Sequence, residues 1–236
     1  MTATTRAAAD GRGTGGVVTQ LERLTPTSTR IRLAGPKLIE FAWTPGDHVR
    51  IPIGSLLVLR TYSIWDADPA AGWLDLVHFN HSTPGSIGLR WAESLELGQY
   101  VRLIRDPRTM KVDPSAPWQL FVGEETAAAG FGAMLRSLPE SADVRGVVQA
   151  DTSIQHIGLP RPLARIERNG ASAASSLQLV DAVAALDLPD LPGVAYLAGE
   201  ARTIQLVRTH LLRDRGWARR NVVTKPFWTP GRRGMD

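Results

Sequence analysis

Cysteine is absent from the 236 residues of the chain. Its absence excludes disulfide bonds, thiolate catalysis, cysteine-held iron–sulfur clusters and cysteine-ligated zinc. The five histidines show neither H-x-x-x-H nor H-E-x-x-H spacing, so we expect no metal ion held by protein ligands. Any redox chemistry must therefore depend on a bound organic cofactor.

Long apolar runs are also lacking. No stretch approaches the roughly 20 apolar residues that a helix needs to span a bilayer, so we expect no membrane insertion. Residues 1–16 are rich in Thr, Ala and Gly and lack the roughly 7–15-residue apolar centre of a secretory signal. We therefore predict that they form a disordered tail and that the protein is cytoplasmic.

Charge is modest, with a formal net charge of +4 and 21% charged residues beside 43% hydrophobic ones. Such a composition is typical of a globular protein, and the positive balance favours phosphates or acidic small molecules as ligands. Outside residues 213–233 the basic side chains are scattered without interleaved aromatics, so we expect no nucleic-acid binding. We expect a monomer that binds small molecules.

The first half of the chain has a β pattern. Short runs of β-type residues are separated by Gly, Pro and Asp, and the runs are residues 17–24, 30–33, 48–53, 58–65, 73–79 and 100–104. One apolar stripe at helical spacing predicts a helix over residues 86–97. This pattern predicts a six-stranded antiparallel β-barrel over residues 17–112.

Beyond Pro107 the pattern changes, and residues 113–117 resemble a linker. Predicted strands (118–122, 144–149, 163–168, 194–198 and 221–225) then alternate with predicted helices (125–138, 176–186 and 201–215). Alternation of this kind predicts a parallel sheet with covering helices, an α/β domain over residues 113–236.

Arg60-Thr61-Tyr62-Ser63 carries the main chemical signal. An arginine can pair with a phosphate, a tyrosine face can stack on a flat heterocycle, and a hydroxyl can bond the edge of that ring. Arg60 and Tyr62 would share one face of a strand, and Ser86 would open the next helix, where a diphosphate can bind. FAD carries both groups. In the competing interpretation Tyr62 is a core residue and Ser86 a plain helix cap.

Two strand-to-helix junctions in the second half could receive a nucleotide. Gly123-Glu124-Glu125-Thr126 follows one predicted strand, and Gly199-Glu200 follows another. Ligands of open α/β sheets bind outside the carboxyl ends of strands. Neither junction has the G-x-G-x-x-G pattern, so either could equally be a tight turn.

Several motifs agree in order with one known family: Pro45-Gly46-Asp47-His48-Val49-Arg50, Arg60-Thr61-Tyr62-Ser63-Ile64, His78 followed by Pro84-Gly85-Ser86 and Trp91-Ala92, Gly123-Glu124-Glu125-Thr126-Ala127, Ala198-Gly199-Glu200-Ala201, and Phe227-Trp228. Through them, residues 16–234 resemble the siderophore-interacting protein family, flavin-dependent ferric-siderophore reductases of the ferredoxin-reductase-like superfamily. The resemblance implies an FAD-binding barrel, an NAD(P)H-binding domain and reduction of iron(III) held by a siderophore.

The same resemblance implies roles for individual residues. Arg60 would hold the FAD phosphate, Tyr62 would lie against the isoalloxazine, and Ser63 would bond near its N5. His78 and Phe79 would flank the flavin, and Ser86 would take the pyrophosphate. The remaining expected cofactor residues are Thr61, Pro84, Gly85, Gly123, Glu125, Thr126, Gly199, Glu200 and Trp228. For the substrate we expect a cationic mouth made by Arg50, Lys225, Arg232 and Arg233.

The sequence thus predicts a reductase that passes electrons from NAD(P)H through FAD to a ferric siderophore and releases iron(II). It leaves the choice between NADPH and NADH open. Two alternatives stay open as well. One is a general NAD(P)H-dependent flavin or ferredoxin-type reductase with another acceptor, and the other is a siderophore-binding protein without catalysis.

Overall fold

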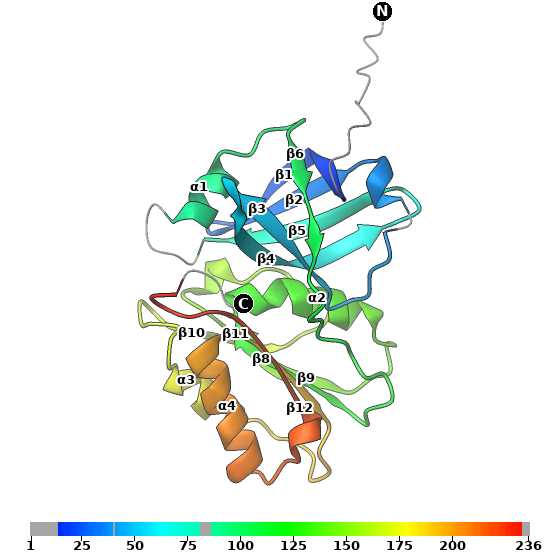
Figure 1. Ribbon diagram of the computed structural model, residues 1–236. Helices are drawn as coiled ribbons and strands as arrows, with labels where there is room; N and C mark the ends of the chain where they lie inside the picture. Colours follow the sequence, from blue (N-terminus) through cyan, green and yellow to red (C-terminus); the bar gives the residue numbers. More distant parts are fainter. Residues whose placement is uncertain (1–13, 40, 81–85, 233–236) are drawn as a thin grey trace, which may run out of the picture.

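The computed structural model describes residues 14–39, 41–80 and 86–232, which form two sheets, one above the other in Figure 1. The upper sheet is antiparallel, in the order β6-β1-β2-β5-β4-β3-β7. Its strands are β1 (Gly15–Thr25), β2 (Ser28–Ala34), β3 (His48–Ile53), β4 (Ser55–Asp68), β5 (Trp73–Phe79), β6 (Tyr100–Arg102) and β7 (Ile104–Arg105). A short 3-10 helix, η1 (Pro36–Leu38), and one α-helix, α1 (Ile87–Glu93), complete it.

The barrel is nearly closed because one expected strand is divided into two short strands. The run predicted at residues 100–104 divides at the buried Leu103 into β6 and β7. β6 pairs with β1 at one edge of the sheet, and β7 pairs with β3 at the other edge. Because both edges are covered, the sheet curls around a core of aliphatic side chains that includes Ile31, Leu33 and Leu76.

The barrel begins earlier than the sequence pattern predicts. β1 starts at Gly15, so the last two residues of the expected tail are strand residues that pair with Arg102 and Val101. A Cβ on Gly15 would lie 2.4 Å from the carbonyl oxygen of Val101, and one on Gly16 would lie 2.9 Å from that of Ala34. The two glycines therefore permit close packing of the backbone in a strand. Their Gly-rich segment has the composition of a loose tail, so the sequence pattern did not predict this strand.

The lower sheet is parallel, in the order β10-β9-β8-β11-β12. Its strands are β8 (Gln119–Glu124), β9 (Val144–Ala150), β10 (Ala164–Glu167), β11 (Val194–Glu200) and β12 (Val222–Trp228). The helices are α2 (Ala128–Ser137), α3 (Leu177–Ala184) and α4 (Ala201–Arg213), with 3-10 turns η2 (Glu125–Ala127), η3 (Ser153–Gln155) and η4 (Arg219–Asn221). The predicted fold class, an antiparallel barrel followed by a parallel α/β sheet, is confirmed.

Helix α2 lies between the barrel and the parallel sheet (Figure 1), and two glycines let it approach the barrel closely. A Cβ on Gly130 would lie 3.3 Å from Ser63 Oγ, and one on Gly132 would lie 2.2 Å from the ring of Trp65. One apolar cluster continues from Phe79 of the barrel into α2 and the sheet. The two halves are therefore packed as one body, with α3 and α4 on the far face of the parallel sheet.

Within the described ranges, no helix is both long and apolar enough to cross a membrane.

Candidate functional site

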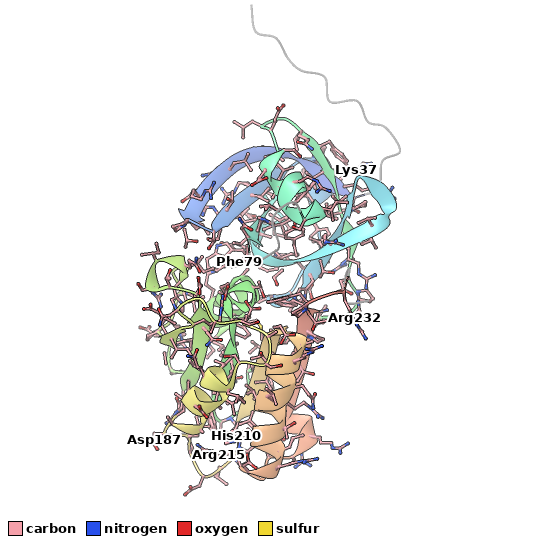
Figure 2. All side chains as sticks on the ribbon, turned by 90° about the vertical axis from the view of Figure 1, so that its left-hand side faces the viewer. Lys37, Phe79, Asp187, His210, Arg215 and Arg232 are labelled. Carbon is pink, nitrogen blue, oxygen red and sulfur yellow. The ribbon has the colours of Figure 1, made fainter. Side chains whose placement is uncertain are left out.

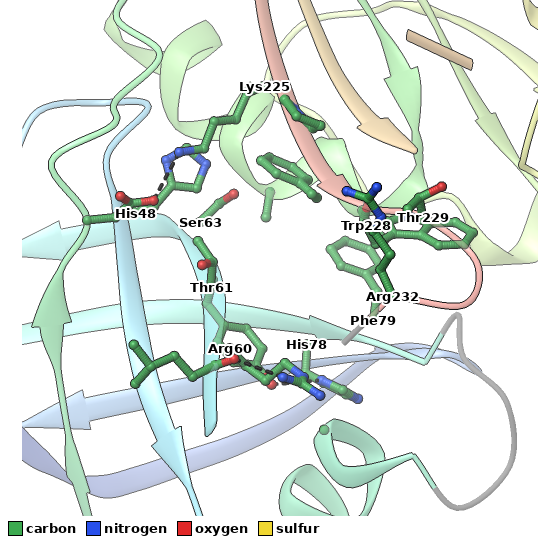
Figure 3. A pocket seen from close by; sticks show the side chains of 18 of the residues that line it. His48, Arg60, Thr61, Ser63, His78, Phe79, Lys225, Trp228, Thr229 and Arg232 are labelled. Atoms are coloured by element: carbon green, nitrogen blue, oxygen red, sulfur yellow. Dashed lines mark hydrogen bonds and ion pairs between the residues drawn. The ribbon is translucent and has the colours of Figure 1, made fainter. Parts of the chain in front are cut away.

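A cavity of about 750 Å³ lies where the barrel meets the carboxyl end of the parallel sheet. Its walls come from β4, β5, the start of α1, the segment after β7, and β12 with the residues that follow it (Figure 3). In the side view of Figure 2, Phe79 from the barrel and Arg232 from beyond β12 both lie at this level. The volume is within the roughly 300–1,000 Å³ of typical ligand sites.

The predicted motif on β4 lines the cavity over its whole length, from Arg60 to Ser63. The Arg60 guanidinium donates to the carbonyl of Leu59 at 2.8 Å, and its Nε is 3.9 Å from the point where Gly88 would carry a Cβ. The cation therefore lies against the first turn of α1. Ser86 also lines the cavity, and its Oγ accepts the backbone N–H of Leu89 at 3.3 Å. Ser86 therefore both caps α1 and lines the cavity.

Helix α1 is shorter than the predicted 86–97, because it ends at Glu93 and Leu95 turns into the barrel core. Its residue Trp91 packs on Tyr62 with ring centroids 5.4 Å apart. The phenol oxygen of Tyr62 is 3.4 Å from Nδ1 of His78, and burial raises the pKa of the phenol above its usual range. Tyr62 is 9% exposed. It is thus a barrel-core residue that also forms part of the cavity wall, as do His78 and Phe79.

A cluster of charges borders the cavity around Asp106, which is 4% exposed. Its carboxylate accepts Lys225 Nζ at 3.0 Å and Arg50 Nη2 at 3.1 Å, and Arg108 lies 3.5 Å away. Burial acts to raise the pKa of Asp106, but the hydrogen bonds from Lys225 and the Arg108 backbone and the neighbouring cations lower it to about 2. Three cations therefore share one ionised carboxylate, and the cluster stays positively charged.

Of the predicted substrate residues, Lys225 and Arg232 line the cavity. Arg50 does not line it, and its side chain pairs with Asp106 in the charged cluster. The fourth, Arg233, lies outside the described residues, as do the predicted cofactor residues Pro84 and Gly85.

His48 is a wall residue to which the sequence assigns no role. It is 3% exposed and lies edge-on to Phe227, with ring centroids 5.3 Å apart. Neither ring nitrogen has a hydrogen-bond partner of normal geometry within the described ranges. Burial, and then the charge of Lys225, lower the pKa of His48 to about 3. The cavity is therefore bordered by a neutral imidazole with unused hydrogen-bonding capacity.

The two strand-to-helix junctions, for which the sequence left a nucleotide site and a tight turn open, are closely packed. A Cβ on Gly123 would meet the carbonyl oxygen of Ala198 at 2.4 Å, and one on Gly199 would meet Glu124 Oε1 at 2.6 Å. Both glycines therefore serve close packing within the sheet.

The acidic residues of the junctions are also engaged inside the protein. Glu125 makes a bidentate ion pair with Arg168 at 2.5 and 2.6 Å, and Glu200 caps α4 by accepting the N–H of Thr203 at 2.8 Å. Of the predicted nucleotide residues Gly123, Glu125, Thr126, Gly199 and Glu200, only Thr126 lines the cavity. The sequence pattern located the sheet edge but not the direction of these side chains.

Trp228, one of the predicted cofactor residues, lines the cavity together with Phe227 of the same motif, and Pro226 and Thr229 beside them are wall residues to which the sequence assigned no role. Asp106 and Arg108 were missed in the same way. Only their positions in the chain could have indicated these wall residues, because each lies next to a predicted site residue or just after the last barrel strand.

Comparison with known proteins bears on the family and the fold. Residues 116–231 match the family described as siderophore-interacting protein. The chain is 26% identical over 236 residues to the mycobactin import ATP-binding/permease protein IrtA of Mycolicibacterium thermoresistibile. The match includes 91% of this chain but only 25% of that relative, so the chain spans about a quarter of its length.

Two solved structures share the fold over almost the whole chain. A siderophore utilization protein from T. fusca has a TM-score of 0.81 at 23% identity, with 94% of each chain covered. The flavohem-like FAD/NAD binding domain of nitric oxide dioxygenase from Vibrio cholerae has a TM-score of 0.74 at 18% identity, covering 93% of this chain and all of that one. Residues 116–231 therefore match the siderophore-interacting protein family, and the chain as a whole has the two-domain fold of ferredoxin-reductase-like FAD- and NAD-binding proteins.

Proposed function

We propose that the protein is an NAD(P)H-dependent flavoprotein that reduces a ferric siderophore through FAD. The observation that carries this proposal is the cavity between the two domains. It brings the Arg60–Ser63 motif and Ser86 together with the cationic residues Lys225 and Arg232. This arrangement supports a flavin site that shares one space with an anion-attracting surface.

The residues present fit FAD. A guanidinium and a serine hydroxyl lie at one part of the cavity, where Arg60 meets the start of α1. The hydroxyls of Thr61 and Ser63 and the aromatic rings of Phe79 and Trp228 line the rest. A charged donor suits a diphosphate, hydroxyls suit the polar edge of a flavin, and rings suit its flat faces.

Each protein group has a defined task in this proposal. Arg60 would pair with the diphosphate, and Ser63 would hydrogen-bond the polar edge of the ring system. The buried Tyr62 and Phe79 would exclude water from the barrel side of the site. When bound, FAD would supply the redox chemistry, because it accepts a hydride from a nicotinamide and can release electrons singly.

The charged cluster suits an anionic acceptor. Lys225, Arg108 and Arg232 line the cavity and are opposed there by one carboxylate, that of Asp106. Ferric chelates with catecholate or carboxylate donors are anionic, so this wall would raise their encounter rate in a salt-dependent way. Reduction lowers the charge of the metal ion and weakens its hold on hard oxygen donors, and iron(II) can then leave.

The test is spectroscopic. The purified protein, reconstituted with FAD, should be yellow, NADPH or NADH should bleach it under anaerobic conditions, and a ferric siderophore should restore the colour. Trapping of the released metal by an iron(II)-specific chelator should give a matching yield. Bleaching without restoration by any ferric chelate would favour a reductase with another acceptor. Failure to bind flavin at all would leave a siderophore-binding protein without catalysis.

A further inference from the structure

His48 is a buried polar side chain that lacks a partner in the part of the chain that the structure describes. It is 3% exposed, and neither Nδ1 nor Nε2 has a hydrogen bond of normal geometry there. A buried donor or acceptor left unpaired costs about 1–3 kcal/mol, so such a ring needs a physical reason. Because the ring lies in the wall of the cavity, a ligand can supply the missing partner.

The hydroxyl of Ser63 is the neighbour of this ring on the next strand. His48 of β3 and Ser63 of β4 are directly paired in the antiparallel ladder. Side chains of such a pair project from the same face of the sheet, with Cβ atoms roughly 4.5–5.5 Å apart. Both of these side chains line the cavity (Figure 3). A ligand whose edge contacts Ser63 therefore lies within reach of His48.

The surroundings of the imidazole fix its place and its charge. Phe227 packs edge-on against it, with ring centroids 5.3 Å apart. The charged groups that act on the ring are Lys225 of β12 and Asp106, which follows β7. Burial, and then the charge of Lys225, lower the pKa of His48 to about 3, so the ring is neutral near pH 7. One ring nitrogen therefore donates and the other accepts, and no described protein group selects which.

A neutral imidazole suits the edge of a flavin that changes in a redox reaction. In the oxidised ring system N5 is a hydrogen-bond acceptor, whereas in the reduced ring system N5 carries a hydrogen and is a donor. A hydroxyl and a neutral imidazole can each donate or accept, but a lysine or a protonated histidine can only donate. His48 and Ser63 together are thus able to satisfy both forms of that edge without a change in charge.

We propose that His48 contacts the flavin and hydrogen-bonds the isoalloxazine edge beside Ser63, as a donor to the oxidised ring system and as an acceptor from the reduced one. The change of role moves the imidazole hydrogen from one ring nitrogen to the other. The ring releases one proton to the cavity and takes up another, and its charge stays zero. This inference rests on the proposed function, since FAD is the ligand.

Affinity for FAD is the first test, measured by fluorescence titration. His48→Phe keeps a ring against Phe227 but removes both hydrogen-bonding groups, so we expect the Kd for FAD to rise about tenfold. His48→Gln offers a donor and an acceptor and should stay within about threefold of the parent. His156→Phe is the matched control, since His156 also has an unpartnered Nε2 but does not line the cavity. An unchanged Kd in His48→Phe, or an equal rise in His48→Gln or in the control, would overturn the inference.

The second test observes the ring in the parent protein, so it does not depend on the folding of a variant. Nuclear magnetic resonance of isotope-labelled histidine shows which ring nitrogen carries the hydrogen, and absence of a signal from His48→Gln assigns it. We expect the neutral ring of His48 to exchange one form for the other when the FAD-loaded protein is reduced by dithionite. A ring that keeps its form, or that becomes protonated, would overturn the inference. So would a signal that ignores FAD and moves only with a gallium(III) siderophore, because the acceptor would then be the partner.

Failure of this role and failure of the proposed function give different results. If the parent and His48→Phe bind FAD equally well, the role of His48 is rejected and the reductase is retained. If both tests succeed but a ferric siderophore does not reoxidise the dithionite-reduced protein, the role of His48 is retained and the siderophore is rejected as acceptor. If the parent binds no flavin, both are rejected.

Discussion

His48 should make the fold sensitive to mild acid. The folded protein keeps this buried ring neutral, since its pKa is lowered from 6.5 to about 3. The unfolded chain binds the proton near pH 6.5, so below that pH the unfolded state holds more protons and the free energy of unfolding falls. The contribution is fully present above pH 6.5 and is lost as the pH decreases toward 3. The slope is about half of its full value of about 1.4 kcal/mol per pH unit at pH 6.5 and approaches that value near pH 5.5, so the loss amounts to about 2 kcal/mol between pH 6.5 and about 4.5.

The assay is urea unfolding of the parent and of His48→Gln at several pH values across that window, at one fixed flavin concentration. Glutamine has a similar volume and takes up no proton. His156, whose pKa burial also lowers, and the carboxylates titrate equally in both proteins. Their contributions therefore cancel in the difference between the two unfolding free energies. A difference that stays constant from pH 6.5 to about 4.5 would refute the reasoning.

Three further predictions concern the cavity and its supports. Arg60→Ala should weaken FAD binding by about 2 kcal/mol, roughly 30-fold, because a charge-assisted bond to the diphosphate is lost; fluorescence titration measures this, and unchanged affinity would contradict the role. Asp106→Asn should lower the free energy of unfolding by about 3 kcal/mol, since the cations of its cluster lose their shared carboxylate; urea unfolding measures this, and a loss below about 1 kcal/mol would show that solvent screens the pairs. Gly132→Ala should cost about 1–3 kcal/mol because its Cβ would lie 2.2 Å from the Trp65 ring. Gly158→Ala, which meets nothing within 4 Å, is the thermal-unfolding control, and equal costs would mean that the ring moves aside.

The sequence predicted the elements whose patterns are local. The strands His48–Ile53 and Trp73–Phe79 have the predicted bounds, because alternation ends at turn residues on both sides. The break at Leu103 was beyond such reasoning. A run of β-type residues does not show that its two ends pair with opposite edges of one sheet, since those edges are built from strands far away in the chain.

The residues of the site divide in the same way, into those that a local pattern predicts and those that only tertiary packing brings together. Arg60 to Ser63 are consecutive on one strand, so a local motif located them at the cavity. Asp106 and Lys225 are 119 residues apart, and only the packing of barrel against sheet brings them together. The junction glycines were correctly placed at strand ends. Their role depends on neighbours in other strands, such as Ala198 beside Gly123, which no local pattern reveals.

One strand sorts the two ligands of the proposed reaction by their chemistry. Lys225 and Trp228 are three residues apart on β12, roughly 10 Å at the usual rise of a strand. At Lys225 the wall is cationic and suits an anionic chelate, whereas at Trp228 and Thr229 it consists of an aromatic ring and a hydroxyl and carries no charge. An anionic ferric siderophore therefore gains more beside Lys225 than beside Trp228, and the uncharged end of a nicotinamide nucleotide gains little beside Lys225. On this reasoning charge directs the electron acceptor of the proposed reaction to the Lys225 part of the cavity and leaves the uncharged part to the electron donor.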